Sequence, residues 1–322
     1  MRPTILLTGK TGQVGSELLR LLPALGDVVA PDRHELNLRN ASSIRQAVRE
    51  IRPGVMVNAA AYTAVDAAET QKADAHAINA DAPAVFTEEA KKIGAMIVHY
   101  STDYVFDGSK REPYEETDSA NPINVYGKTK LAGEQAILTS GVPHLIFRTA
   151  WIYGTRGRNF LLTILRLATE REELKIVCDQ FGAPTWSRDI AEATAKVLAQ
   201  VVRQNISASP FPEVGGIYHL TAGGKTTWNE FACMILEGAA HIPREVPWFA
   251  EATSGRPLIA KRIMPITTAE YPTPAARPAF SVLSNSRLLQ AFGIRLADWR
   301  TQLRSLFGLE CSTPHTILVS NL

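Results

Sequence analysis

The sequence predicts an α/β fold, with a doubly wound parallel sheet in its first half and a second, smaller unit after it. Short apolar runs alternate with amphipathic segments through about the first 150 residues. The runs are apolar throughout rather than at every second position, as in strands that are buried on both faces of a sheet. After about Trp151 the alternation becomes irregular. Wholly apolar strands that alternate with helices are typical of a parallel sheet covered by helices on both sides.

The expected elements of the first half are joined by short connections. The apolar runs predict strands at 4–8, 27–30, 55–58, 95–100 and 144–148. Helical patterns follow the glycine-rich turn at 9–15 as far as about Leu22, and then cover 41–51, 73–94 and 127–139. Ser42 or Ser43 is the expected N-cap of the helix at 41–51. Pro83 interrupts the next helix and is expected to start a new one.

The second half is expected to return once to the sheet. Its pattern predicts helices at 159–173, 188–203, 228–238, 284–293 and 298–307, a short strand at 174–177, and a last strand of the same sheet at 216–220. Residues 242–279 lack periodicity but contain aromatic side chains, so we expect an ordered, irregular covering region there. The tail from Glu310 is weakly patterned, and we expect it to be disordered.

Composition excludes several classes of function. The chain has 322 residues, of which 45% are hydrophobic and 20% charged, as in ordinary globular proteins. A net charge of +2 gives no electrostatic case for nucleic acid or an acidic membrane. Cys178, Cys233 and Cys311 are widely spaced, which favours reduced thiols. Since no signal-peptide pattern precedes the first strand and no apolar run is long enough to span a membrane, we expect a cytoplasmic protein.

The glycine-rich turn is typical of a dinucleotide site. Gly9, Gly12 and Gly15 are spaced as G-x-x-G-x-x-G between the first strand and the first helix. Glycines allow the backbone to turn tightly and approach a pyrophosphate, whose charge the helix N-terminus stabilises. The residues of the loop that we expect to bind cofactor are Gly9, Thr11, Gly12, Gln13, Val14 and Gly15. The sheet is therefore predicted to be of the Rossmann type and to bind NADPH or NADH.

The loop after the second strand bears on the choice of cofactor. Asp32 lies seventeen residues after Gly15, where a carboxylate commonly accepts the ribose hydroxyls of NAD. Arg33 and Lys10 favour the extra phosphate of NADP instead, so both cofactors stay open. Further along the chain, Asn37, Leu38, Ala59, Ala60, Ala61, Thr63 and Tyr100 are also assigned to the cofactor site. The alanines could equally be packing residues at a helix start.

These motifs predict a division into two domains. Residues 1–150 form the Rossmann domain, to which segments within about 174–220 return. Residues 151–322 form mainly a smaller substrate-binding domain, which includes about 151–173 and 221–309.

A tyrosine and a lysine are placed to deliver a proton beside the cofactor. Tyr126 and Lys130 lie one helical turn apart, so a lysine ammonium can stabilise the phenolate and lower the pKa of the tyrosine. Ser101 and Thr102 end the fourth strand, at the sheet edge where ligands bind in such folds. A hydroxyl beside a phenol can hold a substrate carbonyl for proton transfer. The alternative is that these hydroxyls cap their own loop.

Together these motifs resemble the extended short-chain dehydrogenase/reductases and, more closely, the dTDP-4-dehydrorhamnose reductase family. The resemblance extends from about Ile5 to Asp298. The motifs that carry it, apart from the glycine loop, are His99-Tyr100-Ser101-Thr102-Asp103-Tyr104-Val105-Phe106, Asn124-Val125-Tyr126-Gly127, Phe147-Arg148-Thr149-Ala150-Trp151, Asp179-Gln180-Phe181-Gly182-Ala183-Pro184-Thr185 and Tyr271-Pro272-Thr273-Pro274-Ala275.

The resemblance implies reduction of the 4-keto group of dTDP-4-dehydro-L-rhamnose by NADPH or NADH. It assigns Tyr126 as proton donor, Lys130 as the residue that holds the nicotinamide ribose, and Thr102 as a hydrogen-bond partner of the reacting oxygen. The substrate contacts that it implies are Thr102, Asp103, Tyr126, Trp151, Asn159 and Arg277. Arg277 would suit a diphosphate. For Asn159 and Arg277, a helix N-cap and a surface cation are the alternatives.

Four further expectations accompany the resemblance. Some members bind magnesium between two subunits through three carboxylates, of which Glu17 and Asp298 match two while Arg188 stands at the third position, so we expect no bridging magnesium. A homodimer is suggested.

A non-catalytic regulatory subunit, like that of methionine adenosyltransferase, resembles the same family, but the intact Thr102, Tyr126 and Lys130 favour an enzyme. Related epimerases and dehydratases share the tyrosine and lysine; because Tyr104 and not a second acid follows Asp103, simple reduction is favoured.

Overall fold

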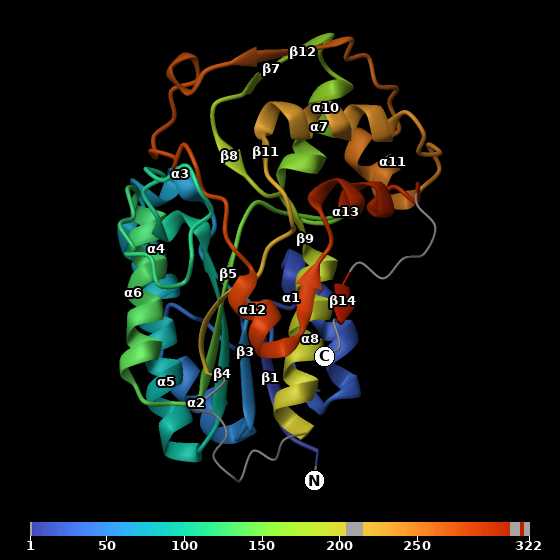
Figure 1. Cartoon of the computed structure of the whole chain (residues 1–322). Helices are drawn as coiled ribbons and strands as arrows, with labels where there is room; N and C mark the ends of the chain where they lie inside the picture. The colour runs from blue at the N-terminus through green and yellow to red at the C-terminus, as the bar shows by residue number, and fades with distance from the viewer. Residues whose placement is uncertain (1, 204–214, 310–315, 319–322) are drawn as a thin grey trace.

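A six-stranded parallel sheet forms the centre of the protein. The computed structural model describes residues 2–203, 215–309 and 316–318 (Figure 1). In the order β10-β5-β4-β3-β1-β2, all neighbouring strands are parallel. The strands are β1 (Thr4–Thr8), β2 (Asp27–Val29), β3 (Val55–Asn58), β4 (Met96–Thr102), β5 (His144–Thr149) and β10 (Gly216–His219). The predicted Rossmann-type sheet is confirmed, including the return of the chain at 216–220.

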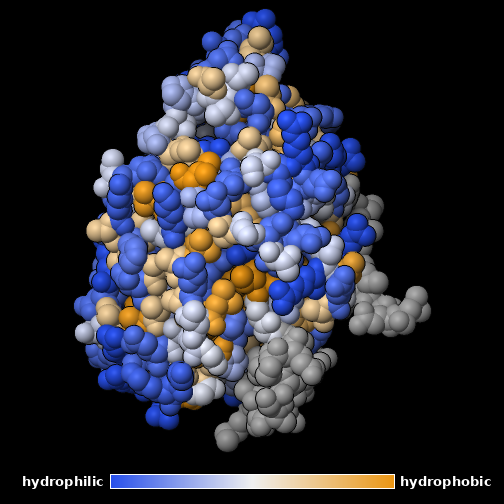
Figure 2. Space-filling view, turned by 60° about the vertical axis from the view of Figure 1, so that its left-hand side comes forward, coloured by the Kyte–Doolittle hydropathy of each residue, from blue (hydrophilic) through white to orange (hydrophobic). Residues whose placement is uncertain are grey.

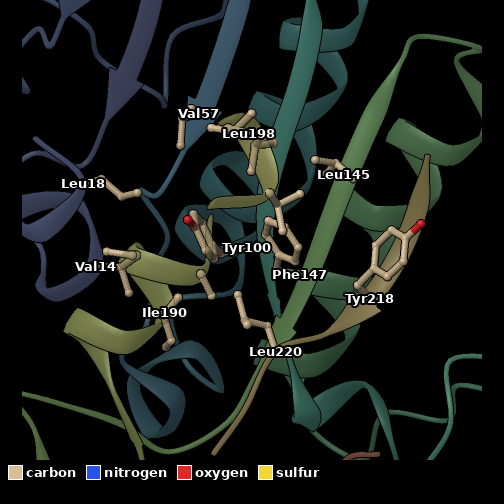
Figure 3. Packing of buried hydrophobic residues seen from close by; sticks show 14 of the residues in the cluster. Val14, Leu18, Val57, Tyr100, Leu145, Phe147, Ile190, Leu198, Tyr218 and Leu220 are labelled. Carbon is tan, nitrogen blue, oxygen red and sulfur yellow. The ribbon is translucent and has the colours of Figure 1, made fainter. Parts of the chain in front are cut away.

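Helices cover both faces of this sheet. On one face lie α1 (Gln13–Leu21) and α8 (Ser187–Arg203), whose Leu18 and Ile190 join the strand residues in one hydrophobic core. Figure 3 shows this packing around Tyr100 and Phe147. On the other face, α2 (Ala41–Ile51), α5 (Ala82–Ile93) and α6 (Val125–Thr139) form a second core. Apolar burial on both faces explains why the strands are apolar throughout.

Local polar residues set the helix ends, and one N-cap prediction is wrong. The cap of α2 is Asn40, not Ser42 or Ser43; its side chain accepts hydrogen bonds from the backbone N–H groups of both serines. Asparagine is as good a cap as serine, so the pattern alone did not separate the candidates. The predicted helix at 73–94 begins as α4 (Lys72–His76), widens into a π-helical turn (Ala77–Asp81) and continues as α5. Pro83 lies in the first turn of α5, as predicted.

The second unit packs around its own aromatic core. This core joins α7 (Phe160–Ala168), α10 (Trp228–Ala239) and α13 (Trp299–Leu306), with Tyr153, Phe231 and Trp299 fully buried. The helix predicted at 159–173 is shorter in the structure, because α7 ends at Ala168. Strand β7 (Glu173–Val177) pairs with β12 (Arg262–Ile266) and not with the six-stranded sheet. Strand β6 (Ile152–Tyr153) pairs with β9 (Thr185–Trp186), and β8 (Phe181–Gly182) with β11 (Thr226–Thr227).

Two predictions for the C-terminal half need correction. Residues 242–279 contain α11 (Pro247–Thr253), β12 and a 3-10 turn at Thr268–Glu270, so the segment is more regular than its sequence suggests. Strand β12 is only recognisable once β7 lies beside it. After α12 (Ser286–Phe292), β13 (Ile294–Leu296) pairs with β14 (Thr316–Leu318), so the tail is ordered at 316–318. The rest of the tail predicted to be disordered lies outside the described residues.

Among the described residues, no helix is both long and apolar enough to cross a bilayer. Figure 2 shows a face on which hydrophilic residues predominate and hydrophobic residues form limited patches.

A buried carboxyl group at the start of α8 lacks a hydrogen-bond partner. Asp189 is fully buried, and neither of its carboxyl oxygens contacts a donor among the described residues. Burial and, to a smaller extent, Glu192 raise the pKa of this group to about 8, while Arg188 and Lys196 oppose the rise. The group is therefore largely protonated in the folded protein at neutral pH, although it would be ionised in the unfolded chain.

We expect Asp189→Asn to make the protein more stable at pH 7.5. From the ordinary pKa of 3.8 up to about 8, the unfolded chain has lost this proton while the folded chain keeps it. Rising pH therefore costs about 1.4 kcal/mol of stability per pH unit in that window. Urea unfolding at pH 5 and 7.5 should show a smaller pH dependence in the variant. Asp27→Asn, at an exposed carboxylate, controls for net charge. An unchanged pH dependence in Asp189→Asn would contradict this account.

Candidate active site

The carboxyl ends of three adjacent strands bring the predicted site residues to one edge of the sheet. The glycine loop follows β1, Asn58 ends β3, and Thr102 ends β4. Since β1, β3 and β4 are parallel neighbours, these ends lie side by side (Figure 1). Helix α6, with Tyr126 and Lys130, packs against β4 and the turn that follows it. This is the edge at which open α/β sheets bind ligands.

Close backbone contacts explain the glycines at positions 9 and 15 of the loop, and a looser contact is found at Gly12. Gly9 has a φ of +74°, and a Cβ there would lie 2.8 Å from the backbone of Ala59. At Gly15 a Cβ would lie 2.0 Å from the Gly9 carbonyl oxygen, so only glycine lets α1 pack this closely on the loop. A Cβ at Gly12 would meet only the Gly9 carbonyl oxygen, at 3.2 Å. Ala59 and Ala60 thus lie against the loop, and their role in binding cofactor stays a prediction.

The start of α1 suits a pyrophosphate. Its N-cap is Gly12, which offers no side chain to the first N–H groups, and its first turn has no acidic residue. Unsatisfied N–H groups and the helix dipole favour an anion at this point. The Gln13 side chain accepts a hydrogen bond from Asn159 Nδ2 at 2.9 Å, which links the loop to α7. The loop geometry therefore fits a dinucleotide.

The residues predicted to choose between NADP and NAD already have contacts within the chain. Asp32 Oδ1 accepts hydrogen bonds from the backbone of His34 and Glu35, and these hydrogen bonds lower the pKa of Asp32. Lys10 Nζ donates to the Ala30 carbonyl oxygen at 2.8 Å. The Asp32 carboxylate thus stabilises its own loop, and the Lys10 ammonium lies at the end of β2. Arg33 and Thr63 are exposed, and Asn37 accepts a hydrogen bond from the backbone of Arg39.

Two glycines allow α6 to approach the turn after β4 and the π-helical turn. A Cβ at Gly127 would lie 2.1 Å from the Tyr104 carbonyl oxygen, and one at Gly133 would lie 2.2 Å from the Asn79 carbonyl oxygen. Asn124 caps the helix through Gly127 N–H and donates to the Ala276 carbonyl oxygen. The glycine beside the tyrosine is therefore what lets Tyr126 stand next to Thr102. Asn79, which the sequence analysis missed, also bonds Thr129 of α6 and lies in the π-helical turn.

Burial shifts Tyr126 further toward its neutral form. Its pKa is raised to about 12 by desolvation, a rise that a hydrogen bond with Thr102 partly opposes and Asp103 increases. The groups that shift this pKa do not include Lys130, so the expected effect of the lysine on Tyr126 stays a prediction. The Thr102 hydroxyl donates to Asp103 Oδ1 at 3.0 Å and accepts from the Tyr104 N–H, so the predicted loop-capping role is real as well.

Lys130 is one of the most deeply buried charged residues of the protein. Only 1% of it is exposed, and its Nζ donates to the Tyr100 carbonyl oxygen at 2.5 Å. Nζ also lies 3.2 Å from Nε2 of His99. Desolvation lowers the pKa of Lys130 to about 8, and Glu134 opposes this fall. The hydroxyl of Tyr100 contacts Thr194 instead of facing Lys130, so Tyr100 holds the lysine through its backbone.

A stacked tryptophan pair joins the sheet to the second unit. Trp151, a predicted substrate contact, has a φ of +47°, which is strained for a residue other than glycine. Its ring stacks on Trp228 with ring centroids 3.5 Å apart, and a Cβ at Gly182 would overlap the indole. Phe160 packs on Trp228 in turn. Trp228 was missed because its only sequence signal is an aromatic at a helix start.

The two remaining predicted substrate contacts are engaged within the chain. Asn159 caps α7 by accepting a hydrogen bond from the Leu162 N–H, which matches the structural alternative. Arg277 forms an ion pair with Asp66 at 2.7 Å and donates to Thr273 and to the Ala275 carbonyl oxygen. These contacts hold the loop around 273–277 against α3 (Val65–Ala68).

The magnesium positions carry ordinary ion pairs. Glu17 pairs with Arg20, Arg188 pairs with Glu192, and Asp298 caps α13. The described residues contain no cluster of three metal-ligating side chains. Because a site shared between subunits would not be formed within one chain, the absence of bridging magnesium stays a prediction.

A dinucleotide edge at which a helix delivers tyrosine and lysine to a strand-end threonine defines the extended short-chain dehydrogenase/reductase class. The chain has this architecture. More narrowly, it belongs to the family described as RmlD substrate binding domain, whose model matches residues 1–309. The family resemblance found in the sequence is confirmed.

Several relatives of this chain carry the same name. It is 50% identical over 92% of its length to a dTDP-4-dehydrorhamnose reductase of Burkholderia thailandensis, 95% of which is covered. It is 43% identical to the protein of that name from Escherichia coli K12, with 94% of this chain and 97% of the relative covered. A Bacillus anthracis dTDP-4-dehydrorhamnose reductase, solved in complex with NADP, is 33% identical with a TM-score of 0.80; 96% of this chain and all (100%) of that chain are covered.

We expect Gly15→Ala to weaken NADPH binding by at least tenfold, because its Cβ would overlap the Gly9 carbonyl oxygen and displace the loop from α1. Fluorescence titration with NADPH measures the effect. Gly54→Ala is the matched control, since a Cβ there has no neighbour nearer than 3.5 Å. Equal dissociation constants for Gly15→Ala and the control would argue against the loop as the pyrophosphate site.

Proposed function

We propose that this chain reduces the 4-keto group of dTDP-4-dehydro-L-rhamnose to dTDP-L-rhamnose, with hydride from NADPH or NADH. The observation that carries the proposal is the meeting of Thr102, Tyr126 and Lys130 beside the glycine loop. Relatives that are 43% and 50% identical bear the name of this activity. A relative that binds NADP supports a nicotinamide cofactor.

The protonation state of Tyr126 suits reduction. Hydride addition to a ketone leaves an alkoxide that needs a proton, so the catalytic group must arrive protonated. With its pKa at about 12, the phenol carries its proton throughout the neutral range. Thr102, which hydrogen-bonds the phenol, is placed to hold the same carbonyl oxygen. The cofactor supplies the hydride when bound; Tyr126 supplies the proton, and Lys130 is placed to hold the nicotinamide ribose.

Unsatisfied polar atoms near the strand end support a hydroxylated substrate. Asp103 is buried, and its Oδ2 has no hydrogen-bond partner among the described residues. Burial raises the pKa of Asp103 to about 6, against the hydrogen bonds from Ser281 and Thr102. A sugar hydroxyl that donated to Oδ2 would satisfy this atom. Trp151 offers an apolar surface beside the same edge. Arg277 offers a cation to a diphosphate, which would compete with Asp66 for the guanidinium.

We expect Tyr126→Phe to lower kcat by a factor of about 10² to 10⁴ while the NADPH dissociation constant changes little. Only the proton donor is lost, and the ring remains to pack on Tyr104. Stopped-flow turnover and NADPH titration separate the two effects. Tyr114→Phe, which removes a phenol that donates to Asp107, is the control and should keep its activity. Near-normal turnover in Tyr126→Phe would refute the assignment.

The substrate is tested by cofactor oxidation. Purified protein is given dTDP-4-dehydro-L-rhamnose with NADPH or NADH, beside UDP- and GDP-linked 4-keto sugars. Turnover with the dTDP substrate supports the proposal. No turnover with any of them, together with intact NADPH binding, would favour the regulatory-subunit alternative. The cytoplasmic location and the homodimer are proposed with the function, and light scattering of the purified protein tests the dimer.

A further inference from the structure

A chain of buried polar side chains runs from β1 to the catalytic lysine. The Thr8 hydroxyl donates to Asn58 Oδ1 at 2.7 Å, Asn58 Nδ2 lies 3.2 Å from Nδ1 of His99, and His99 Nε2 lies 3.2 Å from Lys130 Nζ. All four residues are at most 4% exposed. The Thr8 hydroxyl also accepts a hydrogen bond from the backbone N–H of Ala60, which belongs to the alanine run beside the glycine loop.

The donors and acceptors along this chain conflict at His99. An amide nitrogen and a lysine ammonium can only donate, so each needs a lone pair on the imidazole. Burial, the larger cause, and a charged Lys130 both lower the pKa of His99 well below its ordinary value, so the ring is neutral whether or not Lys130 is charged. A neutral imidazole has a single acceptor nitrogen. With Asn58 Nδ2 on Nδ1, the ring proton lies on Nε2, and Lys130 must accept it as a neutral amine.

A charged Lys130 requires the reverse order of hydrogen bonds. His99 Nε2 must then accept from the ammonium, its proton must move to Nδ1, and the Asn58 amide must turn so that Oδ1 accepts from Nδ1. Thr8 can follow, because a hydroxyl both donates and accepts. Water does not resolve the conflict, since the space lined by Thr8, Asn58 and His99 is too small to hold a water molecule.

We propose that His99, backed by Asn58 and Thr8, is a positioning residue that keeps Lys130 seated in both its protonation states. The imidazole tautomer and the Asn58 amide reverse together when the lysine gains or loses its proton. The inference deepens the proposed function, because it concerns how Lys130 keeps its place beside the nicotinamide ribose.

Few other charges act on this lysine. Glu134, one turn further along α6, is the carboxylate that favours its ammonium, but Glu134 is itself bound by Arg148 of β5 at 2.6 Å and 2.9 Å. From β4, Lys130 meets the neutral His99 ring and the Tyr100 carbonyl oxygen. From the π-helical turn, Asn79 meets α6 as a neutral amide. The network through His99 is thus a principal control on Lys130 that a single substitution can alter.

The test is a direct titration of Lys130, which does not depend on turnover. Protein labelled with ¹³C at lysine Cε is titrated by NMR, and Lys130→Met assigns the signal. His99→Phe removes a partner that the ammonium needs more than the amine does, so the pKa of Lys130 should fall by about one unit or more. Asn58→Asp accepts from Nδ1 and fixes Nε2 as an acceptor, so this pKa should rise.

Two further variants separate a positioning role from a loss of folding. His99→Gln keeps one acceptor for Nζ, so the pKa of Lys130 in this variant should return most of the way from its value in His99→Phe to that of the unaltered protein. If Asn58→Asp does not fold, the comparison of His99→Gln with His99→Phe takes its place as the test. Thr194→Val removes another buried hydrogen bond at β4, that of Tyr100, and should leave the Lys130 titration unchanged. Unchanged titration in His99→Phe, or shifts of the same sign in His99→Phe and Asn58→Asp, would overturn the proposal.

Turnover then distinguishes this inference from the proposed function. If the protein reduces the dTDP substrate, the alkaline limb of its kcat profile should move with the Lys130 titration in each variant. If the Lys130 titration responds as expected but no keto sugar is reduced, the reductase assignment fails and the inference about His99 stands. If the protein is active and the titration does not respond, the inference about His99 fails alone.

Discussion

The close approach of α6 to β4 is the constraint on which the site depends. Glycines at 127 and 133 remove the side chains that would hold the helix away from the Tyr104 and Asn79 carbonyl groups. The buried Glu134–Arg148 pair fastens the same helix to β5. Only at this separation can Lys130 reach the Tyr100 carbonyl oxygen and Tyr126 reach Thr102. A helix set further out by even one methyl group would separate the phenol from the strand-end hydroxyl.

Desolvation is the second theme of this edge, and it acts in opposite directions on acids and bases. It raises the pKa of Tyr126 and of Asp103, and it lowers that of Lys130. Each shift moves the group toward its neutral form. The phenol is held further toward its protonated form, which suits the proposed role of proton donor, while the lysine is left close to the point at which it changes charge. Burial of such groups costs stability, as at Asp189.

Much of the fold follows from the sequence because its signals are local. The runs at 4–8 and 55–58 and the helix at 41–51 have in the structure the bounds that their patterns predict. The sequence-based predictions fail where a contact with another part of the chain decides the local structure. Strand β12 exists because β7 lies beside it, β14 because of β13, and Asn40 displaced two equally suitable serines as N-cap.

The sequence by itself determined the α/β class, the glycine-rich turn after β1 and the placing of Thr102, Tyr126 and Lys130 at one edge of the sheet, because spacing along a strand or helix decides which residues share a face or an edge. The tertiary structure alone decided how these groups are charged and what holds them. The stacking of Trp151 on Trp228, the pairing of Arg277 with Asp66, and the line from Thr8 to Lys130 join residues far apart in the chain. Distance through space and exclusion of water set these contacts and pKa values, and neither quantity is written in local sequence.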